Sequence, residues 1–198
     1  TPQFYVLVAA YFTHLLTGVT VASVSVSHIA EIGVAAGMAA AAAAAIGAKM
    51  LSLESLMQTL ARLGGGFIGD RVDPKWLLVG AQAMLVAGLV ALGAATTLPM
   101  MLLYAVGTGV GFGLTVLAVT VLLLNYYGRR SNLELFSLTC LVGAVSAAGP
   151  FIAGAMRDRL GSFTPTFQLF AAVIAVVFVA ALFMKPPAPP SDMIDVPD

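Results

Sequence analysis

Long runs of apolar residues, broken by short polar turns, are the main pattern of this sequence. Six runs are long enough to cross a bilayer, because a membrane-spanning helix needs about 20 predominantly apolar residues. The breaks contain glycine, proline and charged residues, which are typical of turns. The pattern predicts an all-α polytopic membrane protein with six transmembrane helices, at residues 4–27, 35–68, 76–95, 100–126, 135–156 and 166–184.

The composition indicates that lipid is the main solvent of the chain. Of its 198 residues, 60% are hydrophobic and 9% are charged, and the formal net charge is zero. A soluble domain has about 25% charged residues to cover its surface. The same values exclude a disordered chain, a disulfide scaffold and a basic nucleic-acid binder. We expect one six-helix domain, residues 1–184, followed by a disordered tail, residues 185–198, rich in Pro and Asp.

The loop charges predict how the chain is oriented. Lys and Arg near the ends of spans are retained on the cytoplasmic side. One set of alternate loops contains only Arg157 and Arg159, whereas the other set and the segment after the last span contain Arg71, Lys75, Arg129, Arg130 and Lys185. We therefore expect both ends of the chain, including the tail, to be cytoplasmic in an inner or plasma membrane.

Two segments of the sequence resemble each other. Gly66-Phe67-Ile68-Gly69-Asp70-Arg71 closes the second span, and Gly149-Pro150-Phe151-Ile152, followed by Asp158-Arg159, closes the fifth. These two spans end on opposite sides of the membrane in the predicted topology, as an inverted three-plus-three repeat requires. Proline removes a backbone donor inside a helix, so Gly149-Pro150 also predicts a kink.

The same segments resemble motifs of the major facilitator superfamily. Residues 66–71, followed by Lys75, resemble its Gly-x-x-x-Asp-Arg loop, although Asp73-Pro74 replaces the usual Gly and basic residue. Residues 149–163 resemble the eleventh-helix exit of the monocarboxylate and oxalate/formate branch, and residues 125–130 resemble its loop after helix ten. The resemblance covers about residues 4–184 and implies gating or motif roles for Gly66, Asp70, Arg71, Gly149, Pro150 and Asp158.

The resemblance also implies a function and a partner. It corresponds to the C-terminal six-helix half of a secondary transporter, which carries its substrate by alternating access between two bundles. The sequence begins Thr1-Pro2-Gln3, without an initiator Met or a basic signal-peptide head. We therefore expect the chain to be part of a longer one, completed by an N-terminal six-helix bundle or by a second copy.

The second span contains an unusual stripe of polar residues. Ionisable residues within a span are costly and are candidates for function. Glu54, Gln58 and Arg62 follow each other at intervals of four residues, so they share one helical face. Arg62 also matches the functional helix-eight arginine of the resembling carriers. The hypothesis is that Arg62 binds an anionic substrate while Glu54 or Gln58 modulates it; the alternative is an internal bridge from Arg62 to either residue that only joins helices.

Two further candidates concern protons. Burial favours a neutral carboxyl, so Glu54 is a candidate for coupled proton uptake, which the charge of Arg62 would oppose. His14 lies mid-span, where a proton relay or a substrate contact competes with a structural hydrogen bond to a neighbouring helix.

The remaining patterns limit the class of function. Gly107, Gly109, Gly111 and Gly113 lack the strand and acidic partner of a dinucleotide loop and predict close helix packing or a bend. No nucleophile–base pairing or metal-ligand cluster is evident, so we expect no enzyme activity, cofactor or metal. The leading prediction is transport of a small mono- or dicarboxylate, with possible proton coupling; the alternative is a six-helix scaffold that binds partners through its Gly and Ala faces.

Overall fold

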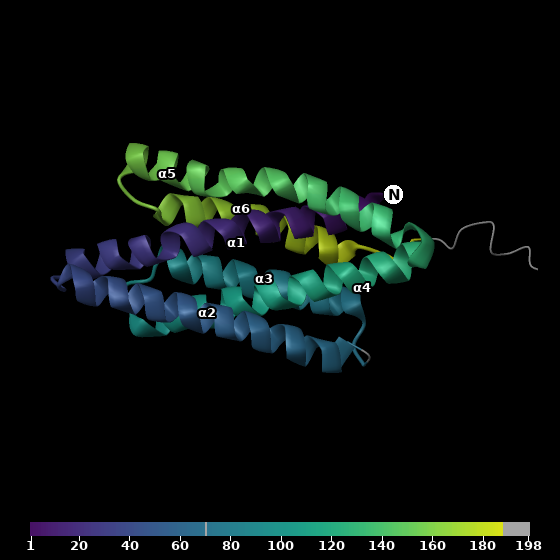
Figure 1. Ribbon diagram of the computed structural model, residues 1–198, viewed down its shortest axis with the longest axis horizontal. Helices are drawn as coiled ribbons and strands as arrows, with labels where there is room; N and C mark the ends of the chain where they lie inside the picture. The colour runs from purple at the N-terminus through teal and green to yellow at the C-terminus, as the bar shows by residue number, and fades with distance from the viewer. Residues whose placement is uncertain (70, 188–198) are drawn as a thin grey trace, which may run out of the picture.

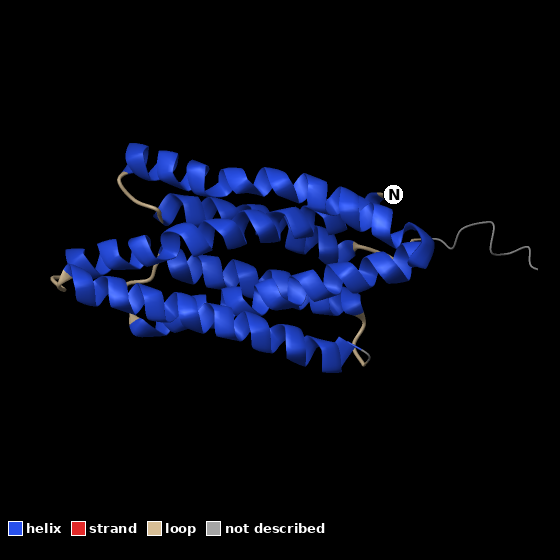
Figure 2. Ribbon diagram, in the orientation of Figure 1, coloured by secondary structure: helices blue, strands red, loops and turns tan. Residues whose placement is uncertain are grey.

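The protein is an all-α bundle of long apolar helices. The computed structural model describes residues 1–69 and 71–187, without the side chains of residues 129–132. Within the described residues there is no β-strand (Figure 2). The elements in chain order are α1 (Pro2–Ala35), α2 (Ala40–Gly69), α3 (Pro74–Gly93), α4 (Leu98–Ala144), the 3₁₀ turn η1 (Val145–Ala148), α5 (Gly149–Leu160) and α6 (Thr164–Phe183).

Six segments of these helices are long and apolar enough to cross a membrane, as the sequence predicts. The fourth and fifth, Leu98–Gly128 and Leu133–Leu160, both include part of α4. Gly128 has a non-helical backbone conformation, with φ 72° and ψ 173°, and there the chain turns back along the bundle (Figure 1). This conformation is accessible to glycine because it has no Cβ. The chain is therefore a six-helix integral membrane protein.

The first predicted turn lies later in the chain than the sequence pattern indicates. The sequence predicts a break between residues 28 and 34, but α1 continues to Ala35 and α2 begins at Ala40 rather than at Ala35. Gly33 remains within helix α1. A Cβ there would lie 2.7 Å from the Cβ of Ala43, so the absence of a side chain lets α1 and α2 approach closely. Gly37, with φ 88°, makes the turn instead.

The short loops are closed by local hydrogen bonds. Asp73 caps α3 by accepting a hydrogen bond of 2.8 Å from the Lys75 backbone N–H, and Pro74 occupies the first helical turn. This pair is where the sequence departs from the family loop, and it forms an ordinary helix start. At the other end of the bundle, Gly161 has φ 74° and its N–H donates to the Arg157 carbonyl at 2.7 Å, which ends α5.

Successive spans run in opposite directions, so the ends of the chain described here lie together. Pro2 of α1 and Phe183 of α6 line the same cavity at one end of the bundle. The last residues of α2 and of α5 lie at opposite ends (Figure 1). This arrangement agrees with the alternating topology predicted from the sequence, whereas Asp70 and residues 188–198 of the predicted tail lie outside the described residues.

Glycines of α4 bring three helices into close contact. A Cβ added to Gly107 would lie 3.0 Å from the Gly88 Cα of α3. One added to Gly113 would lie 2.5 Å from the Gln58 carbonyl oxygen of α2. Gly111 faces α3 and Gly109 faces α2 in the same way, so two pairs of glycines, each with a spacing of four residues, contact two different neighbouring helices. The sequence prediction of close packing is confirmed.

The fifth span is interrupted where the sequence predicts a kink. The 3₁₀ turn η1 directly precedes Gly149, and Pro150 lies in the first turn of α5. Gly149 packs against α1, since an added Cβ would contact the Thr20 hydroxyl and lie 2.8 Å from the Leu16 carbonyl oxygen. The absence of a side chain therefore lets α5 cross α1 closely.

Candidate functional site

A partly open cavity of about 370 Å³, with both polar and apolar lining, lies between α1 and α2, and Phe112 of α4 also lines it. Its polar lining consists of four residues of α1 and α2 that were predicted from the sequence as site residues, together with Ser55, which was not. The lining residues are His14, Leu15, Gly18, Val19, Ala22, Leu51, Glu54, Ser55, Gln58, Arg62 and Phe112. Another cavity of about 310 Å³, between the start of α1 and the end of α6, is mostly apolar and has only Gln3 and Lys185 as polar side chains.

The polar stripe of α2 forms one wall of the cavity. Glu54, Gln58 and Arg62 lie on successive turns of the helix and all face the cavity, as their spacing predicts. Glu54 is buried, with 6% of its surface exposed, Gln58 is partly buried and Arg62 is exposed. The Ser55 hydroxyl donates a hydrogen bond of 3.3 Å to Glu54 Oε2.

The glycine row of α4 holds this wall in place. Cβ atoms added at Gly109 and Gly113 would collide with the backbone carbonyls of Glu54 and Gln58, respectively. The backbone of α2 is therefore pressed against α4 at the two turns from which these side chains extend. Phe112, between two of the glycines, closes the cavity from behind.

His14 reaches the cavity from α1. It is 5% exposed and lies edge-on to Phe112, with ring centroids 5.3 Å apart, and beside Tyr11, with centroids 6.0 Å apart. Its Nδ1 atom is buried and has no hydrogen-bond partner in the part of the chain that the structure describes. The structural alternative for His14, a hydrogen bond to a neighbouring helix, is thus not formed by this atom.

The internal bridge considered for Arg62 is also not formed. Across residues 1–69 and 71–187, leaving aside the side chains of residues 129–132, no acidic group lies within 4.0 Å of the Arg62 guanidinium, and no basic group lies within that distance of the Glu54 carboxylate. The two side chains line the same cavity without forming an ion pair. An arginine stays charged in a protein and offers a planar fork suited to a carboxylate.

The motif residues lie away from this cavity. Gly66 is near the end of α2, with open space where a Cβ would be, and Arg71 is exposed in the following loop. Asp70 is outside the described residues. Gly149 packs against α1 and Pro150 follows it in the first turn of α5, and none of the described motif residues lines the cavity.

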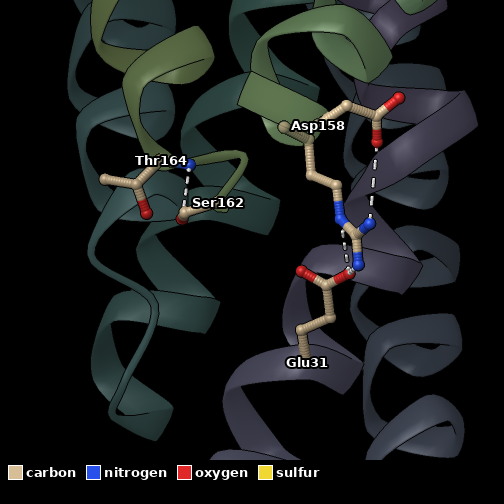
Figure 3. A network of polar contacts seen from close by, with 5 residues as sticks. Glu31, Asp158, Ser162 and Thr164 are labelled. Atoms are coloured by element: carbon tan, nitrogen blue, oxygen red, sulfur yellow. Dashed lines mark hydrogen bonds and ion pairs between the residues drawn. The ribbon is translucent and has the colours of Figure 1, made fainter. Parts of the chain in front are cut away.

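At the opposite end from Arg71, a charged contact joins α1 and α5 (Figure 3). Arg157 donates hydrogen bonds of 2.9 and 3.2 Å to Glu31 Oε1, and its Nη1 lies 3.7 Å from Asp158 Oδ1. Nearby, the Thr164 backbone N–H donates to the Ser162 hydroxyl at 3.1 Å, at the start of α6. Asp158 therefore belongs to a surface ion-pair group and not to the cavity.

The sequence did not single out Phe112 or Ser55 as site residues. Phe112 lies within an apolar run, and its only signal is its place between Gly111 and Gly113, where small neighbours leave room for a large ring. Ser55 is one of several serines and threonines in the second span, and its role depends on the rotation of α2 about its axis, which the contact with α4 sets.

Comparison with known proteins does not name a family. No family model matches the chain, and no curated protein matches it. The structure itself establishes an integral membrane protein of six apolar helices with a polar cavity between α1 and α2.

Proposed function

We propose that this chain is one six-helix bundle of a secondary transporter that carries a small mono- or dicarboxylate. The observation that carries the proposal is Arg62, a permanent cation that lines the partly open cavity between α1 and α2 and has no ion-pair partner among the described residues. A carboxylate bound in the cavity would supply the missing negative charge through charge-assisted hydrogen bonds. Gln58 and His14, which line the same cavity, would orient the bound anion.

The sequence motifs support an alternating-access mechanism with a second bundle. The resemblance to the major facilitator superfamily points to a partner of six helices, either an N-terminal half or another copy of this chain. Rocking of two bundles about a shared site would expose Arg62 to each side of the membrane in turn. In this proposal the protein is not an enzyme and needs no cofactor, and coupling to protons through Glu54 is one way to drive uptake.

The distribution of charges supports the orientation of the bundle. Arg71 lies in the loop between α2 and α3, Lys75 lies in the first turn of α3, and Lys185 follows α6, all at the end of the bundle where the described chain begins and ends. Excess Lys and Arg marks the cytoplasmic side of short loops. In this proposal both ends of the described chain face the cytoplasm, the Glu31–Arg157 contact faces the other side, and the bilayer is an inner or plasma membrane.

Substitution of Arg62 tests the transport proposal. The full-length protein, reconstituted in proteoliposomes, would be assayed for counterflow with a panel of mono- and dicarboxylates, and for equilibrium binding of the same compounds in detergent. A charge-assisted hydrogen bond is worth about 1.5–3 kcal/mol, so Arg62→Ala is expected to weaken binding by about tenfold or more. Arg62→Lys is expected to recover part of it, because a lysine keeps the charge but not the planar fork.

Arg159→Ala is the matched control, because Arg159 is an exposed arginine at the end of α5, outside the cavity lining. Wild-type binding and counterflow by Arg62→Ala would contradict the proposal. The same result would favour the alternative of a six-helix scaffold, for which the exposed alanines at the start of α2 offer a contact face. The glycines of α4 are less available for partners, since they are already used between α2, α3 and α4.

A further inference from the structure

The cavity between α1 and α2 contains one basic and one acidic side chain, Arg62 and Glu54, which form no ion pair with each other. Arg62 lacks an acidic partner, and Glu54 lacks a basic one, among the described residues. The Glu54 carboxylate receives one hydrogen bond, from Ser55, and only 6% of the residue is exposed. Burial of an ionised carboxylate is costly unless it is paired and hydrogen-bonded. A ligand that carried only negative charge would satisfy Arg62 and leave Glu54 without a counterion.

The spacing of the two residues keeps them apart. They are eight residues apart on one helix, which places their Cα atoms about 12 Å apart along the helix axis. Gln58 lies between them on the same face. Side chains of a helix lean towards its start, so Arg62 leans towards Glu54 while Glu54 leans away from Arg62, and no ion pair forms between them within 4.0 Å. The cavity wall therefore presents a positive group and a negative group at two separate positions.

The rest of the lining suits the carbon chain of a small ligand. Leu15 and Val19 of α1 and Phe112 of α4 provide apolar surface, and His14 adds a buried ring nitrogen, Nδ1, without a hydrogen-bond partner in the described structure. An unpaired buried polar atom is costly and marks a place where a ligand or a water completes a hydrogen bond. His14 comes from α1, so a ligand between the walls would contact both helices.

We propose that the cavity binds a zwitterionic carboxylate, an amino acid whose carboxylate is held by Arg62 and whose protonated amine is held by Glu54. The inference rests on the proposed function, which it narrows from carboxylates in general to those with a cationic second group. Such a ligand would pair its carboxylate with Arg62 and its amine with Glu54. The ligand is neutral overall, and the charges of Arg62 and ionised Glu54 also sum to zero. Electrostatic complementarity of this kind determines specificity.

Matched ligand pairs test the inference on the full-length protein in detergent. β-Alanine would be compared with propionate, and γ-aminobutyrate with butyrate, by equilibrium binding. Each amino compound is expected to bind about tenfold or more tightly than its partner, because a charge-assisted hydrogen bond is worth about 1.5–3 kcal/mol. Glu54→Gln keeps the shape of the side chain and removes its charge, so it is expected to abolish this preference. Glu134→Gln, at an exposed glutamate of α4, is expected to retain it.

Equal binding of the acid and the amino compound by the wild type would overturn the inference, and so would a preference that survives Glu54→Gln. If the Glu54→Gln variant does not fold, the wild type is tested by comparing the binding of β-alanine with that of its hydroxyl analogue. Equal affinity for the two compounds would show that the site does not recognise a positive charge. Failure of the proposed function is distinct, since it requires that Arg62→Ala leave the binding of all these carboxylates unchanged.

Discussion

Two regions of the molecule each contain an arginine and a glutamate, and they use them differently. At one end of the bundle, Arg157 of α5 and Glu31 of α1 form an ion pair at 2.9 Å. In the cavity, Arg62 and Glu54 of α2 line the same space without an ion pair. The first pair joins two helices at the bundle surface, where both side chains are about half exposed. In our proposal, the second pair binds a ligand.

The difference follows from which helices carry the charges. Arg157 and Glu31 come from different helices whose ends meet, so their side chains are free to approach. Arg62 and Glu54 are fixed on one helix at a separation of two turns, which exceeds the three or four residues at which side chains of a helix pair. The cavity is instead positioned by backbone contact at the α4 glycines. An ion pair adds to the contact of α1 with α5 in the first region, and close backbone packing alone positions the second.

The largest expected effect is at the glycine contact that positions the cavity. Gly109→Leu would place a side chain against the Glu54 carbonyl and the Met57 Cβ, so α2 would have to move away from α4. We expect a loss of about 1–3 kcal/mol in the free energy of unfolding, as is typical of overpacking, and loss of carboxylate binding. Thermal unfolding in detergent and equilibrium binding measure the two effects.

Gly80→Leu on α3 is the matched control, because Gly80 has no atom within 4 Å of an added Cβ. Equal stability of the two variants would show that close packing of α2 on α4 does not position the cavity.

A smaller effect is expected for the ion pair at the end of the bundle. In a double-mutant cycle with Glu31→Ala and Arg157→Ala, we expect a coupling energy of about 0.2–1 kcal/mol, because both groups are solvent-accessible. The coupling should decrease as salt screens the charges. Denaturant unfolding of the four proteins at low and high ionic strength measures it. A coupling of zero at low salt would remove the contrast between the two regions.

The smallest effect is expected within the cavity itself. Without ligand, the corresponding cycle with Glu54→Gln and Arg62→Ala should give changes in unfolding free energy that add within about 0.3–0.5 kcal/mol, as for residues that do not share an interaction. The same unfolding assay applies. A coupling well above that range would show that the two charges neutralise each other and are not reserved for a ligand.

The sequence by itself determined the class of structure and part of the site. Long apolar runs require helices in lipid, because backbone groups there must be paired within the segment, and this predicted the six spans. The four-residue spacing of Glu54, Gln58 and Arg62 placed them on one face because helical periodicity is local. The interruption before Gly149 was likewise predictable, since it depends on the backbone chemistry of its neighbours.

Only the tertiary structure decided which helices complete the cavity. His14 and Phe112 are far from α2 in the chain, and they line its polar face because glycines let α1, α2 and α4 approach closely. The same packing determined that Gly109 and Gly113 serve α2 while Gly107 and Gly111 serve α3. It also determined that Arg157 pairs with Glu31 whereas Arg62 has no partner in the described structure. These outcomes depend on the relative positions of whole helices, which periodicity along one helix does not specify.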